Sequence, residues 1–541
     1  MKNLLLALVL TTPALAQTLD VNEVVYVETT LDTDSDGVKD RIYVSINRPN
    51  SNEKLASILE VSPYSLGGTE VPMHNVDFEE LPQDTMLGMV KSWKSAEMKS
   101  QVSVASAPAE LRYANISAHS IGTGYSTGCP TVGDESEALA VKSVIDWLNG
   151  RARAFDRNNK EVSATSWSSG NVGMTGISYN GTLPIMVAAT GVEGLKAIVP
   201  IAAISNWYDY YRANGLVVNP GGYIGEDADI LGYYIVRKNA CRSEMAALTR
   251  IQGREHGDFS PFWQVRNHLA NADKIKAATF IIHGQSDWNV KQKHAIQLWE
   301  ALDGVVPRRM FLHRGGHGSS NSHRVPGKIR DWFDHFLYGV ENGITDGPQV
   351  EVELFNGSLM VQNQWPSENT TRTRLYFNAG ESLLSAPGVA NVEEFEDTGK
   401  NTRLESLRST ARLSYLSAPL TKETVLSGTA MVQLKLAVMN RAAANVTVAI
   451  VSVDASGRST IITRGWADPQ NYADITTGEK LVPGKFYILR FPLEPKQAKI
   501  AAGNRIGIMV ASTDYEYTLR PAAGTRLQLS LGSESFIDLD I

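Results

Sequence analysis

Apolar positions between residues 24 and 344 alternate between short strand-like runs and longer helical patterns. Such alternation is typical of a mostly parallel sheet covered by helices on both faces, and it predicts an α/β fold. The expected strands are 41–46, 57–61, 114–118, 172–177, 195–201, 278–283 and 309–313, and the expected helices are 138–149, 181–190, 291–302 and 328–337.

Two segments depart from this alternation. Residues 205–277 are aromatic-rich and helical in pattern, show no strand, and are too long for an ordinary connection, so we expect a helical cap inserted over the sheet. After the turn-rich sequence GVENGITDGP at 339–348, apolar and polar residues alternate, as at 432–438 and 527–531. This alternation predicts an all-β, jelly-roll-like sandwich at 348–541, preceded by an α/β domain at 17–347.

The composition is that of an ordinary globular protein, with 43% apolar and 20% charged residues. A chain of 541 residues is too long for one hydrophobic core, which agrees with a division into domains. A formal net charge of -7 and a pI near 5.9 provide no basic surface for nucleic acid or an anionic membrane. We therefore expect neither nucleic acid nor a membrane as a partner. The sequence leaves the oligomeric state open, and a homo-oligomer is one of the alternatives.

The first residues, MKNLLLALVLTTPALAQ, have the pattern of a secretory signal peptide. Lys2 precedes a short apolar run, and Ala14-Leu15-Ala16 is a small-x-small cleavage sequence. The run at 4–10 is much shorter than the roughly 20 apolar residues that a membrane-spanning helix needs. We expect residues 1–16 to be removed and the mature protein to be secreted or periplasmic.

The chain has two cysteines, Cys129 and Cys241. In an oxidising compartment such a pair is as readily bridged as free, and we predict a disulfide that ties the cap to the sheet domain. Cysteine and histidine show no zinc-type spacing, so we expect catalysis to need no metal or other cofactor.

An acidic segment near the amino terminus resembles a calcium loop. Its carboxylates occupy alternate positions around Gly37, but Tyr43 stands where the bidentate glutamate of such a loop is expected. A structural calcium ion and an acidic hairpin turn without metal are equal alternatives. The candidate ligands are Asp32, Asp34, Asp36 and Asp40.

A serine in a strand–turn–helix context is the candidate nucleophile. The sequence Gly176-Ile177-Ser178-Tyr179-Asn180-Gly181 lies between a predicted strand and a predicted helix, and we interpret it as a turn of the G-x-S-x-G type. Small flanking residues permit the sharp turn that lifts the hydroxyl above the sheet. A serine hydroxyl also needs an imidazole to take its proton and an acid to orient that imidazole.

The acid and the base follow in the order that the α/β-hydrolase fold uses. Asp287 comes just after the strand at 278–283, and His317 lies one loop beyond the strand at 309–313. His313 should lie inside its strand, and His323 is the alternative base. Without a catalytic role, Asp287 would be an ordinary turn residue and His317 an ordinary surface or core histidine.

Four segments resemble the Xaa-Pro dipeptidyl-peptidase family: GISYNGTLPIMVAATGVEGLKAIVP, SNWYDYYRANGLVVNPGGYIGED, HGQSDWNVK and HRGGHG. The family belongs to a superfamily with cocaine esterase-like and α-amino-acid ester hydrolases. The resemblance covers the whole mature chain, including the C-terminal β domain. It implies a serine exopeptidase that releases Xaa-Pro dipeptides, through an acyl-enzyme, from proline-containing peptides with a free N-terminus.

The resemblance also implies roles for individual residues. The backbone N–H of Tyr179 and the hydroxyl of Tyr64, in Ser62-Pro63-Tyr64, would form the oxyanion hole, and Glu226 would bind the substrate ammonium. Alternatively, Tyr64 could serve packing alone, Glu226 could lie on a solvated face, and the aromatic residues could belong to the core. The aromatic candidates for a proline slot are Trp207, Tyr210 and Trp288.

Two other functions remain open on the sequence alone. An α-amino-acid ester hydrolase or a carboxylesterase would use the same three catalytic residues on the same scaffold. A binding protein whose β domain recognises a glycan or a cell-surface partner would leave them idle.

Overall fold

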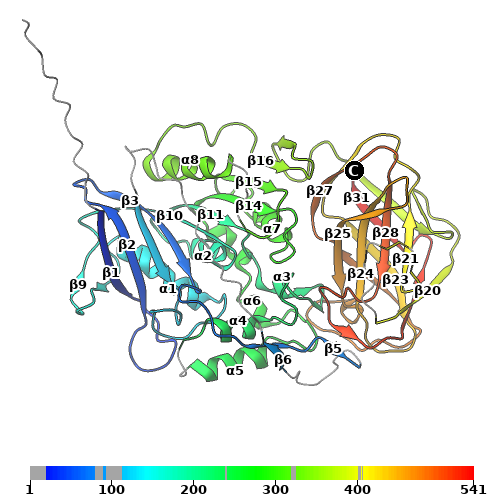
Figure 1. Ribbon diagram of the computed structural model, residues 1–541, viewed down its shortest axis with the longest axis horizontal. Helices are drawn as coiled ribbons and strands as arrows, with labels where there is room; N and C mark the ends of the chain where they lie inside the picture. The colour runs from blue at the N-terminus through cyan, green and yellow to red at the C-terminus, as the bar shows by residue number, and fades with distance from the viewer. Residues whose placement is uncertain are drawn as a thin grey trace, which may run out of the picture.

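The computed structural model describes residues 20–79, 89–92, 113–237, 241–318, 324–399, 404, 406–407 and 409–541. An α/β part and a β-rich C-terminal part lie side by side (Figure 1). The predicted signal peptide and His323 lie outside the described residues. In the described part of the chain, no helix has the length and apolar character needed to cross a membrane.

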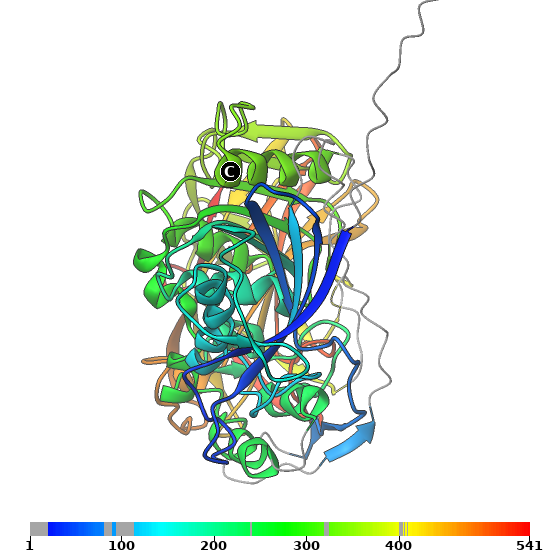
Figure 2. The ribbon, with the colours of Figure 1, turned by 90° about the vertical axis from the view of Figure 1, so that its left-hand side faces the viewer.

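A twelve-stranded sheet forms the α/β part, in the order β17-β16-β15-β14-β11-β10-β3-β7-β2-β1-β8-β9. The strands from β7 to β16 are parallel, and the pairs at both edges are antiparallel. Figure 2 looks at the sheet from the edge that carries β1. The strands are β1 (Asp20–Glu28), β2 (Arg41–Pro49), β3 (Leu55–Ser62), β7 (Ala114–His119), β8 (Ala154–Phe155), β9 (Glu161–Val162), β10 (Ser168–Ile177), β11 (Leu195–Ile201), β14 (Ala278–Gly284), β15 (Arg308–His313), β16 (Val350–Glu353) and β17 (Leu359–Gln362).

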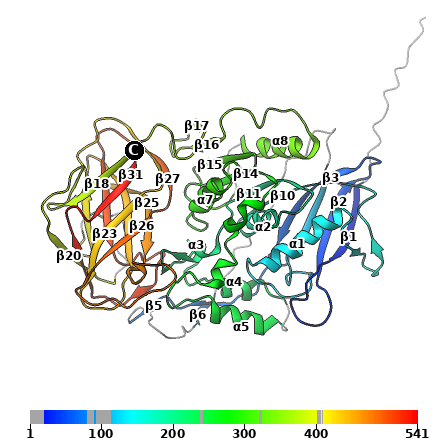
Figure 3. The same cartoon turned by 180° about the vertical axis from the view of Figure 1, so that it is seen from behind.

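Helices cover both faces of this sheet, which confirms the predicted fold class. Along β11, Ile198 packs in the core that also holds Leu183 of α2, whereas the next residue, Val199, packs with Phe333 of α8 on the opposite face. Consecutive strand residues are therefore both buried, as a sheet between two helical layers requires. The helices α1 and α2 are seen from behind in Figure 3. The helices are α1 (Glu135–Leu148), α2 (Tyr179–Ala188), α7 (Lys293–Ala301) and α8 (Arg324–Tyr338).

The inserted segment is largely helical, but the expectation that it holds no strand is wrong. Asn214 and Gly215 have φ angles of 48° and 83°, and this left-handed pair makes a tight turn between two short strands. The periodicity of the sequence gives no sign of such short strands. The elements are α3 (Trp207–Tyr211), β12 (Arg212–Ala213), β13 (Leu216–Val217), α4 (Ala228–Ile235), α5 (Arg242–Ile251), α6 (Pro261–Gln264) and the 3-10 helix η2 (His268–Lys274).

A disulfide joins the cap to the sheet part. Cys129 lies in the loop after β7, and Cys241 is the residue before α5. Both are buried, and they are separated by 112 residues.

We expect replacement of both cysteines by alanine to lower the free energy of unfolding by about 4 to 5 kcal/mol, because the bridge closes a long loop in the unfolded chain. The melting temperature of the double variant, compared with that of the unreduced protein, measures the effect. Two titratable thiols in the denatured, unreduced protein would contradict the bridge.

The C-terminal part is β-rich and mostly antiparallel, with an eleven-stranded sheet. The first sheet continues through β16 and β17 to residue 362, beyond the predicted domain boundary of 348. Val350 and Val352 alternate like the later strands, but β16 pairs in parallel with β15 and so extends the first sheet. The strands of the second sheet are β18 (Arg372–Asn378), β19 (Ser382–Leu384), β20 (Val392–Asp397), β21 (Arg412–Leu416), β23 (Met431–Val438), β24 (Val446–Val453), β25 (Ser459–Ala467), β26 (Phe486–Pro492), β28 (Arg505–Ala511), β30 (Thr525–Ser530) and β31 (Phe536–Asp540).

Four pairs of short elements complete the described structure. Of these, β5 and β29 join the two parts of the molecule by parallel pairing. The 3-10 helix η3 (Pro469–Asn471) also lies in the C-terminal part. The remaining pairs are β12 with β13, β4 (Pro72–His74) with β6 (Met89–Ser92), β5 (Asp77–Phe78) with β29 (Arg520–Pro521), and β22 (Thr424–Gly428) with β27 (Lys496–Ile500).

Candidate active site

Ser178 occupies a strained turn between β10 and α2. Its φ and ψ are 65° and -128°, a conformation that residues other than glycine rarely adopt. A Cβ atom on Gly176 would lie 2.3 Å from the carbonyl oxygen of Asn180, and one on Gly181 would lie 2.7 Å from that of Gly176. The second glycine follows the serine by three positions, so the motif is G-x-S-x-x-G and the G-x-S-x-G interpretation is corrected.

His317 connects Ser178 to Asp287. Its Nε2 lies 2.9 Å from the Ser178 hydroxyl oxygen, and its Nδ1 lies 2.8 Å from Oδ2 of Asp287. The other carboxylate oxygen of Asp287 accepts the N–H groups of Asn289 and Val290 at 3.0 and 2.9 Å. A carboxylate fixed in this way holds the proton on Nδ1, which leaves Nε2 free to accept the serine proton.

The acid and the base lie on adjacent loops at the carboxyl ends of β14 and β15. The N–H of Gln285 donates to the carbonyl of His313, and that of Ser286 donates to Gly315. A side chain on Gly284 would meet the carbonyl oxygen of Gly316 at 2.2 Å, so the two loops pack backbone against backbone. His313 is the last residue of β15, inside its strand.

Tyr179 and Tyr64 lie beside the serine. The N–H of Tyr179 opens α2, where no carbonyl of the helix can accept it, so it is free to face a developing oxyanion. The Tyr64 ring packs edge-on against Tyr179, with ring centroids 6.1 Å apart, and lines the same pocket as Ser178. Burial, with the nearby Glu226 carboxyl, raises the pKa of Tyr64 well above its usual value, which keeps its hydroxyl a donor.

Glu137 of α1 is a buried acid that sequence reasoning missed. Its Oε2 accepts the Tyr179 hydroxyl at 2.7 Å and the Gly133 N–H at 2.9 Å, and its Oε1 accepts the Ser120 hydroxyl. These bonds hold the side chain of Tyr179, the residue that follows the nucleophile. The sequence signal was weak, because Glu137 lies in the first turn of a helix, where an exposed glutamate is ordinary.

Glu226 is a buried carboxyl in the pocket of the serine. It is 5% exposed and accepts a hydrogen bond of 2.9 Å from the Tyr211 hydroxyl. Burial raises the pKa of Glu226 to about 8. The pocket is lined by Tyr64, Ser178, Tyr179, Ile204, Tyr210, Tyr223, Glu226, Leu231, Asn289 and His317.

The raised pKa of Glu226 predicts a pH-dependent stability. Between its usual value of 4.5 and about 8, the folded protein holds a proton that the unfolded chain has lost, so stability falls as pH rises through this window. Between these limits we expect the free energy of unfolding of the wild type to fall by up to roughly 4 kcal/mol relative to that of Glu226→Gln. Melting temperatures of both proteins from pH 4 to 9 measure the difference, and a difference independent of pH would contradict it.

The three aromatic candidates occupy three different places. Tyr210 lines the pocket and donates its hydroxyl to Asn289 at 3.1 Å. Trp207 is fully buried behind Tyr179, with ring centroids 4.8 Å apart, and Trp288 packs on Trp466 of the C-terminal part. Neither Trp207 nor Trp288 lines the described pocket, because Tyr179 lies between Trp207 and the pocket and the Trp288 ring packs on Trp466, so of the three candidates for a proline slot only Tyr210 is placed there.

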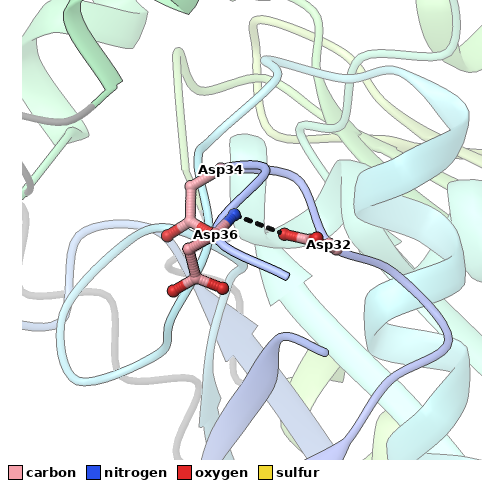
Figure 4. A group of neighbouring side chains, drawn as sticks. All are labelled: Asp32, Asp34 and Asp36. Atoms are coloured by element: carbon pink, nitrogen blue, oxygen red, sulfur yellow. Dashed lines mark hydrogen bonds between the residues drawn. The ribbon is translucent and has the colours of Figure 1, made fainter. Parts of the chain in front are cut away.

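Three of the four predicted calcium ligands come together. The carboxylates of Asp32, Asp34 and Asp36 lie within 4.8 Å of one another, and Asp32 accepts the N–H of Asp36 at 3.1 Å (Figure 4). Asp40 does not join them: its Oδ2 accepts the N–H and the hydroxyl of Thr33 at 2.7 and 2.8 Å. The prediction is thus wrong for Asp40, whose position beside β2 buries its side chain. Calcium binding by the other three stays a prediction.

Comparison with known proteins places the chain among peptidases. The family model for X-Pro dipeptidyl-peptidase (S15 family) matches residues 36–319, and the model for the X-Pro dipeptidyl-peptidase C-terminal non-catalytic domain matches 342–536. A relative from Bacillus cereus, provisionally named an Xaa-Pro dipeptidyl-peptidase, is 43% identical over 94% of this chain and 89% of its own length. The Xaa-Pro dipeptidyl-peptidase of Ligilactobacillus salivarius is 32% identical over 92% of this chain and 74% of its own length.

Solved structures share the fold across the chain. A CocE/NonD family hydrolase from Staphylococcus aureus has a TM-score of 0.71 and 16% sequence identity, covering 99% of this chain and 98% of its own. An α-amino acid ester hydrolase has a TM-score of 0.66 and 16% identity, with 98% of each chain covered. At such identities the likeness concerns the fold alone.

Proposed function

This chain belongs to the X-Pro dipeptidyl-peptidase (S15) family of serine hydrolases, and we propose that it releases Xaa-Pro dipeptides from free peptide N-termini through an acyl-enzyme. The observation that carries this proposal is the position of Glu226. A buried carboxyl in the pocket of Ser178 suits a substrate whose ammonium group lies a short, fixed distance from the bond to be cut.

The proposed chemistry uses three side chains of this chain and one water molecule. The Ser178 oxygen attacks the proline carbonyl carbon while its proton passes to Nε2 of His317, and Asp287 stabilises the imidazolium. His317 then protonates the leaving amine as the peptide bond breaks. Water loses a proton to His317, attacks the ester and releases the dipeptide, and the proton returns to Ser178.

The negative charge on the carbonyl oxygen needs donors in fixed positions. The Tyr179 N–H and the Tyr64 hydroxyl, which lie beside Ser178, are the groups we assign to this role. Tyr210 supplies an aromatic wall to the same pocket for the proline ring.

Glu226 makes the enzyme an exopeptidase in this proposal. In the free enzyme the buried carboxyl accepts a hydrogen bond from the Tyr211 hydroxyl, and a substrate ammonium would add a cationic partner, so substrates without a free amine lose that interaction. The same group would bind the amine of an α-amino-acid ester, and the reaction products therefore distinguish the two activities.

Product analysis tests the proposal. Peptides beginning Ala-Pro-Gly and Gly-Phe-Gly, and an α-amino-acid ester, are incubated with the enzyme in separate reactions, and the products are identified by mass spectrometry. We expect intact Ala-Pro to be released from the first peptide and little product from the second. Cleavage of amino-acid esters with no dipeptide released from either peptide would favour an ester hydrolase.

We also propose that the enzyme acts outside the cytoplasm, with residues 1–16 as its signal peptide. The Cys129–Cys241 disulfide supports this location, because such bonds persist in oxidising compartments.

A further inference from the structure

The loop that carries Glu226 is held at both ends of its turn. The N–H of Gly221 donates to the carbonyl of Trp288 at 2.8 Å, next to the triad acid. The carbonyl of Gly225 accepts the N–H of His74 at 2.9 Å, and a Cβ on Gly225 would lie 2.3 Å from the His74 oxygen. Gly225 also has a φ of 88°, so glycine is needed for both the conformation and the close approach.

Asn219 connects this loop to the C-terminal part. Its side-chain oxygen accepts the N–H of Gly225 at 2.8 Å, one residue before Glu226. Its side-chain nitrogen and its backbone N–H both donate to the carbonyl of Tyr517, at 3.1 and 2.7 Å. Asn219 is fully buried, so water cannot replace either interaction.

The segment that presents the Tyr517 carbonyl is itself rigid. The N–H groups of Tyr517 and Thr518 donate to the carbonyl of Asp514, and the Asp514 N–H donates to the Thr518 hydroxyl. The Asp514 carboxylate accepts from Arg464 at 2.9 Å and from Trp466 at 3.0 Å, both on β25. The carbonyl is therefore fixed by the second sheet.

We propose that Asn219 is a positioning residue through which segment 514–518 of the C-terminal part places Glu226, so that this part determines amine recognition. The inference rests on the proposed function, because it takes Glu226 as the group that binds the ammonium. The C-terminal part then contributes to specificity without touching substrate.

Asn219→Ala tests this assignment. The measured quantity is the ratio of kcat/KM for Ala-Pro-para-nitroanilide to kcat/KM for the neutral ester para-nitrophenyl acetate, which needs the serine but no amine anchor. We expect the ratio to fall by about tenfold or more, because the Gly225 N–H loses its buried acceptor next to Glu226 and the Tyr517 carbonyl keeps only the backbone N–H of residue 219. The loss should lie mainly in KM. A merely structural role would lower both activities together and leave the ratio unchanged.

Two further variants keep the test decisive. Asn471→Ala is the matched control: it removes another buried asparagine that bonds across the two parts, to Asp258 at 2.8 Å, and should leave the ratio unchanged. Thr518→Val loosens segment 514–518 without altering Asn219 and should lower the ratio, and it decides the question if Asn219→Ala does not fold. An unchanged ratio in Asn219→Ala or Thr518→Val, with a lowered ratio in Glu226→Gln, would overturn the inference while the proposed function stands. An unchanged ratio in Glu226→Gln would instead remove the amine anchor itself.

Discussion

Replacing Ser178 with alanine is expected to lower kcat for Ala-Pro-para-nitroanilide by about a million-fold while leaving the fold intact. The hydroxyl 2.9 Å from His317 is the only nucleophile of the protein that the proposed mechanism uses, so what remains is catalysis by oxyanion stabilisation and binding. Alanine adopts the strained turn no less readily than serine, so the melting temperature should change little. Turnover close to that of the wild type would disprove the assignment.

A fluorophosphonate probe gives an independent measurement of the same prediction. The wild-type enzyme should be labelled and Ser178→Ala should not. Ser163→Ala, at an exposed serine in the loop after β9, is the matched control and should be labelled like the wild type. Labelling of Ser178→Ala would point to a different nucleophile, and an unlabelled wild type would favour a binding protein.

Replacing Glu226 with glutamine should lower kcat/KM for free-amine Xaa-Pro substrates. The loss should correspond to a rise of ~2 to 4 kcal/mol in the activation free energy. The variant keeps the shape of the side chain but cannot pair as an anion with the substrate ammonium. Because the pKa of Glu226 is about 8 in the free enzyme, the measurement is made near pH 8, where a large share of the carboxyl is ionised.

The neutral ester is the control for Glu226→Gln. Its hydrolysis should change little, because the variant leaves Ser178, His317 and Asp287 in place. Equal losses on the ester and on the free-amine substrate would mean that Glu226 supports the pocket and does not read the amine.

The sequence predicted best the features that depend on local order. Apolar runs located the central strands, and glycines around Ser178 marked the nucleophile turn. Positions just past strand ends identified Asp287 and His317, since parallel strands present their carboxyl ends at one edge of the sheet. The edge strands β16 and β17 were missed because their short alternation resembles that of the second sheet.

Side-chain directions could not be read from the sequence. Trp207 precedes the pocket residue Tyr210 by three positions, yet its ring lies behind Tyr179. Trp288 directly follows Asp287, yet its ring packs on Trp466 of the C-terminal part. Asp40 continues an acidic pattern but bonds to Thr33. The link between Asn219 and Tyr517 spans 298 residues, and no local pattern signals such a contact.

The most direct test of the account compares Ala-Pro-para-nitroanilide with its N-acetylated form on the wild-type enzyme. Both substrates present the same proline carbonyl to Ser178, and only the first carries an ammonium group for Glu226. We predict that acetylation lowers kcat/KM by about a hundredfold, the loss expected when a buried charged group is left without its partner. Equal cleavage of the two substrates would contradict the proposed exopeptidase and leave an acyl hydrolase with no amine anchor.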